Sequence, residues 1–466
     1  MSLPELHRKI GHRKARLAVI GLGYVGLPVA CQFAQAGFNV LGVEIRLERV
    51  QLVNAGISPF EENEPGLAEL LAGVIANGKL RATANYAELY DRDVILIDVE
   101  TPVDESHHPQ YEALRSAVCG LGPVLKPGAL VIIESTIAPG TMQQVVLPLL
   151  SESSAKQVNR DYFLGNCPER VMPGKLLTNL RTLSRVVGGM TPDTAAVMVA
   201  LYRWVVQADL DPTDCITAEL VKTVENAYRD VQIAFANEVA LICEAVGGDV
   251  WKVRELVNKT PYRQMHLPGA GVGGHCIPKD PWLLAYGVKD RSVPVRLIPA
   301  ARAVNDSMPG HMAGLVSQAL ADAAGCPLAG ARILVLGYAY LEDSDDTRNS
   351  PSERLVSLLQ GEGAETVVHD PYVPGYQGDL YEMARDCSAV VVMVSHREYL
   401  HLDLEQLKSA LRTPLLVEGR PVMAPGQAQE AGFLHYRVGQ APLENVRDGR
   451  SESGLSRMKD GQEGLA

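Results

Sequence analysis

The chain has 466 residues, of which 47% are hydrophobic and 21% charged, as in a globular protein large enough for two to four domains. Its net charge of -12 argues against a nucleic-acid-binding surface, so an anionic ligand would need a local group of cations. The eight cysteines are scattered without a CxxC pair, which favours a reducing cytoplasm over a disulfide framework or a zinc site.

The N-terminal third has the pattern of strands alternating with helices. Residues 1–14 are basic and lack a period, so we expect a flexible arm. Apolar runs at 17–20, 39–44, 94–99 and 130–134 then predict buried strands, with 185–188 as a further strand. Such alternation predicts a doubly wound parallel sheet covered on both faces, here a Rossmann domain over residues 15–211.

A glycine-rich turn follows the first predicted strand. Gly21, Gly23 and Gly26 have the GxGxxG spacing, with a helix following them, which indicates a dinucleotide site. Glu44 ends the next strand, where a carboxylate binds the ribose diol and repels a 2′-phosphate, so the pattern favours NAD over NADP. Arg46 is a counter-signal, because a guanidinium there could meet such a phosphate.

Two turn-like segments, 134–141 and 166–175, follow predicted strands of this sheet. Ligands bind at the carboxyl ends of parallel strands, so Thr136 and Glu169 are candidates for ordering or deprotonating a water molecule. The alternative is that both side chains only cap turns. Cys167 is interpreted as a packing residue.

Residues 217–246 carry an uninterrupted helical period, and a helix of this length spans about 45 Å. Lys222 and Asn226 are four residues apart, hence on one face, where an amine and an amide could stabilise an oxyanion. The alternative is a solvated polar face. We expect a central helical and dimerisation domain over residues 212–325.

The stretch 269–281 surrounds Cys276 with four glycines and ends with Asp280 and Pro281, the signature of a helix start with Asp280 as N-cap. Glycines permit close approach of a ligand, and a helix N-terminus favours the thiolate. An inert cysteine in a surface loop is the alternative. His275 is interpreted as structural, and no histidine lies among acids at ligand spacing, so no metal site is predicted.

Apolar runs at 332–336, 366–370, 389–394 and 414–418 predict a second Rossmann-like sheet, in a domain over residues 326–443. Residues 444–466 are polar and rich in Gly and Ser, so a disordered tail is expected.

Over about residues 16–430 the chain resembles the UDP-glucose/GDP-mannose dehydrogenase family. The matching stretches are GLGYVGLP (21–28), ESTIAPGT (134–141), PER (168–170), the Lys222/Asn226 helix, GVGGHCIPKDP (271–281) and DDTRNSP (345–351). The resemblance implies two Rossmann-like domains joined by a long central helix, with NAD bound by the first and a nucleotide diphosphate by the last. It also implies a homodimer or a higher homo-oligomer, with no nucleic-acid or membrane partner, in the cytoplasm.

The resemblance implies a four-electron oxidation of the C6 hydroxyl of a UDP-sugar to a carboxylate. Cys276 would carry a thiohemiacetal and then a thioester, and Lys222 and Asn226 would hold the oxyanion. Asp280 and Thr136 would share proton removal with Lys222, and Glu169 would act on the hydrolytic water.

The binding residues implied in the same way fall into two groups. Those for the cofactor are Gly21, Gly23, Tyr24, Val25, Gly26, Glu44, Thr101, Thr136 and Arg348. Those for the substrate are Glu169, Arg170, Lys222, Asn226, Arg263, Gly273, Lys279 and Arg420.

Two positions depart from the family pattern. Leu341 replaces a lysine that usually faces the substrate, so Lys279 or an arginine must supply that charge. Pro173 replaces the glutamate of the UDP-glucose branch, which favours the branch acting on UDP-N-acetylglucosamine or UDP-N-acetylmannosamine. UDP-glucose and GDP-mannose are alternative substrates. A single-step β-hydroxyacid dehydrogenase and a non-catalytic nucleotide-sugar sensor are alternative functions.

Overall fold

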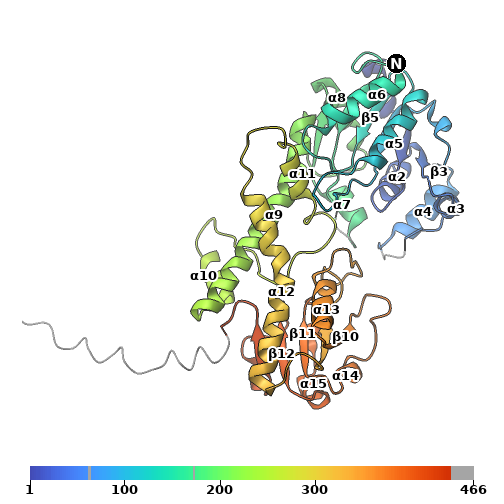
Figure 1. Cartoon of the computed structure of the whole chain (residues 1–466). Helices are drawn as coiled ribbons and strands as arrows, with labels where there is room; N and C mark the ends of the chain where they lie inside the picture. The colour runs from blue at the N-terminus through green and yellow to red at the C-terminus, as the bar shows by residue number, and fades with distance from the viewer. Residues whose placement is uncertain (61–63, 172–173, 442–466) are drawn as a thin grey trace, which may run out of the picture. The chain divides into compact units, whose positions relative to one another are not determined.

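The computed structural model describes residues 1–60, 64–171 and 174–441, which form two compact units (Figure 1). Among the described residues, the first unit comprises 1–230 and 275–299, and the second comprises 231–274 and 300–441. The predicted tail at 444–466 lies outside the described residues, as does Pro173.

The first unit is built on an eight-stranded sheet of order β3-β2-β1-β4-β5-β6-β7-β8. The strands are β1 (Arg16–Ile20), β2 (Asn39–Val43), β3 (Leu80–Thr83), β4 (Val94–Ile97), β5 (Leu130–Ile133), β6 (Phe163–Asn166), β7 (Arg185–Gly189) and β8 (Leu210–Asp214).

The first six strands are parallel, as predicted, but β7 pairs antiparallel with β6 and parallel with β8. The expectation of an all-parallel sheet is therefore wrong at this end. Helix α7 (Leu176–Thr182) precedes β7 and has seven residues, only about 10 Å of helix. Because the chain enters β7 two residues after α7, β7 starts near the edge where β6 ends.

Two hydrophobic cores cover the two faces of this sheet. Alternate residues of β1 divide between them, with Leu17 and Val19 in one core and Ala18 and Ile20 in the other. Strand side chains point alternately to opposite faces, so a strand that is apolar throughout indicates a sheet buried on both sides. The doubly wound α/β class predicted for this region is confirmed.

The N-terminal segment forms α1 (Leu3–Gly11), whose Leu6 and Ile10 are fully buried in the first core. The expected flexible arm at 1–14 is therefore wrong. Leu6 and Ile10 are four residues apart and share one helix face, a spacing too brief to stand out among the basic residues around it.

The helices of the first unit connect its strands and lead into the second unit. They are α2 (Gly26–Gln35), α3 (Leu47–Asn54), α4 (Leu67–Ala76), α5 (Glu112–Leu121), α6 (Leu147–Ser154), α8 (Pro192–Tyr202), the first half of α9 (Cys215–Val246) and α11 (Asp280–Tyr286). The predicted long helix is confirmed as α9, which has 32 residues. Helix α11 begins one residue earlier than expected, so Lys279 is its N-cap and Asp280 its first residue.

The second unit holds a five-stranded parallel sheet of order β10-β9-β11-β12-β13. Its strands are β9 (Arg332–Leu336), β10 (Glu365–His369), β11 (Ala389–Val392), β12 (Leu415–Glu418) and β13 (Leu434–Arg437). Ile333 and Val335 pack in one core, and Leu334 and Leu336 in another, so this sheet is also covered on both faces. The second Rossmann-like sheet is confirmed.

Two long helices run alongside one another in the second unit, the second half of α9 and α12 (Leu297–Ala324) (Figure 1). Asn237 on α9 donates a hydrogen bond to Asn305 on α12 at 2.9 Å, and Glu244 lies 3.0 Å from His311. The other helices of the unit are α10 (Val250–Asn258), α13 (Pro351–Gly361), α14 (Leu380–Met383), α15 (Leu404–Ala410) and α16 (Gln427–Glu430).

Candidate active site

The glycine turn after β1 has the geometry of a dinucleotide site. Gly21 has φ +92°, and a Cβ there would collide with the carbonyl oxygen of Asp98. A Cβ at Gly26 would collide with the Gly21 carbonyl, whereas a Cβ at Gly23 would meet no atom within 4 Å. Protein packing thus explains two of the glycines, while the third leaves open space above the turn. This space suits a pyrophosphate approaching the N-terminus of α2.

Glu44 directly follows β2 and is 6% exposed. One carboxylate oxygen accepts the backbone N–H of Arg46 at 3.0 Å, and the other lies 3.3 Å from the guanidinium of Arg49. The carboxylate is thereby held in one orientation at the end of the strand, where a ribose diol would bind. Sequence reasoning singled out Arg46, but Arg49 is the residue whose guanidinium pairs with Glu44.

The turn at 134–141 is pinned by residues distant in sequence. The hydroxyl of Thr101 donates a hydrogen bond of 2.6 Å to the carbonyl of Thr136, which brings these two predicted residues together. Glu219 of α9 accepts the backbone N–H groups of Gly140 and Met142, each at 2.7 Å. Sequence reasoning missed Glu219, which lies three residues before Lys222 and fixes the turn against α9.

Helices α9 and α11 bring together the predicted oxyanion donors and the predicted acid. The side-chain amide of Asn226 donates a hydrogen bond to Asp280, which is fully buried. Asp280 also forms an ion pair of 3.1 Å with Lys279, whose ammonium donates to the Thr101 carbonyl at 3.3 Å. Lys222 is 9% exposed, and its ammonium has no hydrogen bond or ion pair with any residue that the structure describes. A largely buried lysine whose ammonium meets no counter-charge among the described residues is suited to an anion arriving with a ligand.

Cys276 is exposed and precedes α11. Its carbonyl accepts the backbone N–H groups of Asp280 at 2.8 Å and Lys279 at 3.2 Å. These bonds tie the cysteine to the first turn of the helix that carries Asp280, and through Asp280 to Asn226. His275 lies in the same loop and is half-buried. By contrast Cys167 is fully buried, and burial raises its pKa to about 12, as suits a packing thiol.

Glu169 is 7% exposed and lies beyond the end of β6. One carboxylate oxygen accepts the backbone N–H of Arg170 at 2.8 Å, and the other pairs with the guanidinium of Arg185. The Arg170 guanidinium itself donates to the carbonyl of Ser184 at 2.9 Å and pairs with Glu225 on α9. Glu169 is thus held at the same edge of the sheet as the turn that contains Thr136.

The other predicted substrate residues belong to the second unit. A Cβ at Gly273 would lie 2.8 Å from the carbonyl oxygen of Asn349, so a glycine is required there for packing. Arg420 donates to the Pro268 carbonyl at 3.1 Å, and Arg348 is held by Asp346 through a 2.8 Å hydrogen bond. Arg263 is exposed. Segment 269–274 therefore lies beside Arg348 and Arg420 within this unit.

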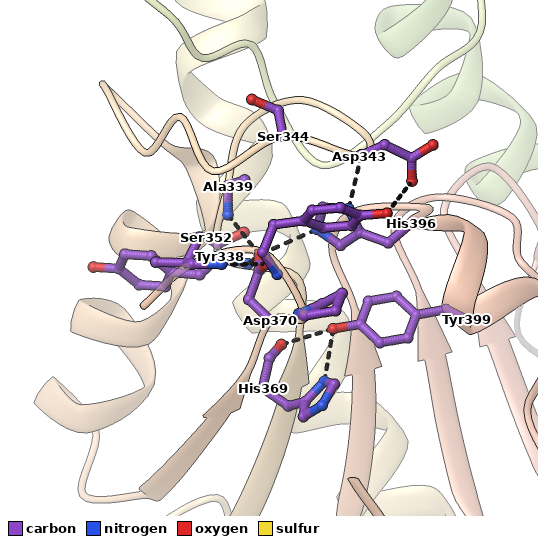
Figure 2. Close-up of polar contacts among 12 residues, drawn as sticks. Tyr338, Ala339, Asp343, Ser344, Ser352, His369, Asp370, His396 and Tyr399 are labelled. Atoms are coloured by element: carbon purple, nitrogen blue, oxygen red, sulfur yellow. Dashed lines mark hydrogen bonds and ion pairs between the residues drawn. The ribbon is translucent and has the colours of Figure 1, made fainter. Parts of the chain in front are cut away.

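The loops after β9 and β11 form the topological switch point of the second sheet, because β10 lies on one side of β9 and β11 on the other. Figure 2 shows Asp370 beneath the first of these loops, where its carboxylate accepts the backbone N–H groups of Tyr338 and Ala339. His396, from the second loop, lies 3.1 Å from the same carboxylate, and its Nδ1 accepts the N–H of Asp343. The buried Asp370 thereby fixes both loops where such sheets bind ligands.

Leu341 lies in the first of these loops and is 37% exposed. Among the residues that the structure describes, no group of three or more His, Cys, Asp or Glu side chains is arranged to hold a metal ion. No described helix has the length and apolar composition needed to cross a membrane.

Three family models match the chain in succession. The NAD binding domain of the UDP-glucose/GDP-mannose dehydrogenase family matches residues 15–206, its central domain matches 216–307, and its UDP binding domain matches 334–425.

Individual relatives match over nearly their whole length. A UDP-N-acetyl-D-mannosamine dehydrogenase of Pyrococcus horikoshii is 37% identical over 92% of this chain and 100% of its own, and its solved structure superposes with a TM-score of 0.86. The enzyme of that name from Salmonella typhi is 36% identical over 82% of this chain and 94% of its own. The structure of an NDP-N-acetyl-D-galactosaminuronic acid dehydrogenase from Methanosarcina mazei is 36% identical, covers 95% of this chain and 98% of that one, and gives a TM-score of 0.82.

Proposed function

Because the chain belongs to the UDP-glucose/GDP-mannose dehydrogenase family, we propose that it oxidises the C6 hydroxyl of a UDP-2-acetamido sugar to a carboxylate, with UDP-N-acetylmannosamine as the substrate. The observation that carries the proposal is the bond from Asn226 to Asp280, since it joins the helix bearing Lys222 to the first turn of α11, which directly follows the loop bearing Cys276. The named relatives act on acetamido sugars, which supports this substrate class.

The cofactor is NAD, and the residues of the first unit fit it. The open space over Gly23 admits a pyrophosphate, and the fixed carboxylate of Glu44 suits a ribose diol. We assign Tyr24, Val25 and Gly26 to the same turn, Thr101 and Thr136 to the nicotinamide side, and Arg348 to the cofactor as well. When bound, NAD accepts the hydride removed from C6, and two molecules are reduced for each sugar oxidised.

The protein's own residues handle protons, the covalent intermediate and its charge. Asp280 and Thr136, with Lys222, order the water that takes the C6 hydroxyl proton in the first oxidation. The Cys276 thiolate then adds to the resulting aldehyde to form a thiohemiacetal. Lys222 and Asn226 donate hydrogen bonds to its oxyanion, and each such donor typically contributes about 10²–10³ in rate. The second oxidation leaves a thioester on Cys276.

Water then hydrolyses the thioester. Glu169 takes a proton from this water as its oxygen bonds to the acyl carbon, the C–S bond breaks, and the proton passes to the leaving sulfur. The product is the uronic acid, which ionises in water, and the thiol is restored.

The nucleotide end of the substrate is assigned to the second unit. The cations Arg263, Arg348 and Arg420 and the tightly packed Gly273 belong to it, and guanidinium groups pair well with diphosphates. Lys279 and Arg170 are also proposed substrate contacts. With Leu341 in place of a lysine, these cations must supply the charge that faces the diphosphate.

The proposal is tested by NADH formation with UDP-N-acetylmannosamine, UDP-N-acetylglucosamine, UDP-N-acetylgalactosamine, UDP-glucose and GDP-mannose. We expect two NADH per UDP-N-acetylmannosamine consumed and the highest kcat/KM for that sugar. One NADH per molecule would indicate a single-step dehydrogenase. Binding of nucleotide sugars without NADH would indicate a sensor.

We also propose that α9 is the interface of a homodimer. Large apolar side chains are exposed along it at intervals of four and seven residues, which places them on one side of a helix. They are Ile216, Leu220, Val224, Tyr228, Phe235, Ile242 and Val246. A second copy of the same helix offers a matching apolar surface, as a two-fold axis requires. The scattered buried thiols, such as Cys31 and Cys243, suit the cytoplasm as the compartment.

A further inference from the structure

Four ionisable side chains meet at the edge of the first sheet where its parallel strands end. Of these four, only Glu169 has a role in the proposed mechanism. Asp98 directly follows β4, Glu134 follows β5, and Glu169 lies beyond β6. Arg185 is the first residue of β7, and because β7 is antiparallel to β6 it reaches the edge where the other three strands end. Arg185 is 2% exposed and Glu134 1%.

Arg185 bridges two of the carboxylates. One guanidinium nitrogen donates to Glu134 at 3.2 Å, and another pairs with Glu169. The hydroxyl of Tyr202, on α8, donates to the same oxygen of Glu134 at 2.6 Å, and the Arg185 guanidinium lies 5.1 Å from the Tyr202 ring. Glu169, the proposed base for hydrolysis, is thus fixed by Arg185. Arg185 is itself held by Glu134 and lies against the ring of Tyr202.

The cluster has more acids than cations. Three buried carboxyl groups face one guanidinium, and three buried negative charges would carry a large desolvation cost. Oδ2 of Asp98 and Oε2 of Glu134 accept no hydrogen bond from any N–H or hydroxyl group of the described residues. Burial, followed by the neighbouring Glu134, raises the pKa of Asp98 well above its usual value, and burial also raises that of Glu134. The two carboxyl groups of Asp98 and Glu134 therefore favour sharing one proton, which avoids two adjacent buried negative charges.

We propose that Arg185 is a positioning residue for thioester hydrolysis, which orients the carboxylate of Glu169 toward the attacking water while the proton-sharing pair Asp98–Glu134 anchors its other side. This inference rests on the proposed function, because it needs an acyl group on Cys276. Because Arg185 is shared between Glu134 and Glu169, it stabilises the Glu169 carboxylate less than it would as the partner of Glu169 alone. Hydride removal does not involve this cluster, so its loss should affect one chemical step only.

The test compares Arg185→Lys with Arg92→Lys, using full-length enzyme, UDP-N-acetylmannosamine and NAD. Arg92 is 9% exposed, and its guanidinium donates a hydrogen bond to Asn39, the first residue of β2. It therefore tests the same substitution at the edge of the sheet where the parallel strands begin. Lysine cannot bridge two carboxylates as a guanidinium does. We expect Arg185→Lys to release a rapid burst of two NADH per active site and then turn over at least about tenfold more slowly, with acylated Cys276 found by mass spectrometry after quenching. Arg92→Lys should behave as the unaltered enzyme.

An unchanged steady-state rate in Arg185→Lys, or a slowed burst without acyl-enzyme, would overturn the inference. If the unaltered enzyme itself forms no NADH with any nucleotide sugar, the proposed function fails instead, and this inference with it.

Glu134→Gln provides an independent test of the inference if Arg185→Lys does not fold. The ionisable groups that interact with Glu169 are Asp98, Glu134, Cys167 and Arg185, while Tyr202 contacts Glu134 and Arg185. With a neutral amide at 134, Arg185 pairs with Glu169 alone, so the acidic limb of the hydrolysis rate should move about one unit lower in pH. A merely structural role for the cluster predicts an unmoved pH profile with a lowered Tm, and that result would also refute the inference.

Discussion

Asn226 donates a hydrogen bond to Asp280 across 54 residues of sequence. The bond joins the face of α9 that carries Lys222 to the first turn of α11, directly after the loop that carries Cys276. Two sequence motifs are thereby brought together, one with Lys222 and Asn226 and the other with Cys276 and Asp280.

Lys222→Ala should lower kcat about 10²–10³-fold, because the ammonium is one of two donors proposed for the oxyanion. NAD binding should persist, since Lys222 does not belong to the glycine turn. Steady-state kinetics with NAD titrated by fluorescence checks both statements. Lys252→Ala, which removes an exposed lysine paired with Glu255, is the matched control. Equal losses in both variants would remove Lys222 from the mechanism.

Glu44→Ala should raise KM for NAD about 10–100-fold, since a charged hydrogen bond to the ribose diol contributes about 1.5–3 kcal/mol. The KM for NADP should not rise and should fall if anything, because the substitution removes the carboxylate that repels a 2′-phosphate. Glu48→Ala, on the exposed surface of α3, serves as control. An unchanged NAD-to-NADP ratio would show that Glu44 does not select the cofactor.

Glu219 should make the protein less stable as the pH rises. Burial raises the pKa of Glu219 to about 7 from an ordinary 4.5, so between these values the folded chain binds this proton more tightly than the unfolded chain. The free energy of unfolding should therefore fall by roughly 3 kcal/mol from below pH 4.5 to above pH 7 through this group.

Urea unfolding of the protein and of Glu219→Gln at pH 4.5 and pH 8 isolates that contribution. The difference between the two pH values should be smaller in Glu219→Gln, because its amide does not titrate. Identical pH dependence in the two proteins would refute the assignment. Other buried carboxyl groups contribute equally to both and cancel in the comparison.

Phe235→Glu should shift the protein from dimer to monomer in sedimentation velocity, because it places a charge within the exposed apolar side of α9. Phe235 is 59% exposed. Lys252→Glu, on the exposed surface of α10, makes a charge change away from that side and should leave the sedimentation coefficient unchanged. A dimer that survives the Phe235 substitution would place the interface elsewhere.

The sequence predicted those features that depend on local pattern. The glycine turn, the long helix α9 and the apolar strands β1, β4, β5, β9 and β11 each carry a strong short-range pattern. Strands β3, β8 and β13 were not predicted, and β6 was expected only as the strand before the turn at 166–175. Strand β8 reads Leu-Asp-Pro-Thr-Asp, with four polar or proline residues, and the pairing with β7 alone makes it a strand.

The site was predicted as separate motifs, and its supporting residues were not. Glu134 was noted only as the end of a predicted strand and as part of a matching stretch, and Arg185 only as the start of a strand. Their relation depends on the reversed direction of β7, which is a property of tertiary structure. Asp98 was read as a residue of an apolar run, and its burial beside Glu134 has no local sequence pattern.

The central claim is that Cys276 becomes acylated during turnover. The most direct measurement is mass spectrometry of the Cys276 peptide after acid quenching of enzyme mixed with UDP-N-acetylmannosamine and NAD, with Glu169→Gln included to slow hydrolysis. We expect a uronyl adduct on Cys276 that is more abundant in Glu169→Gln. Two NADH per sugar from a Cys276→Ser enzyme at the normal rate, with no adduct in either protein, would contradict it.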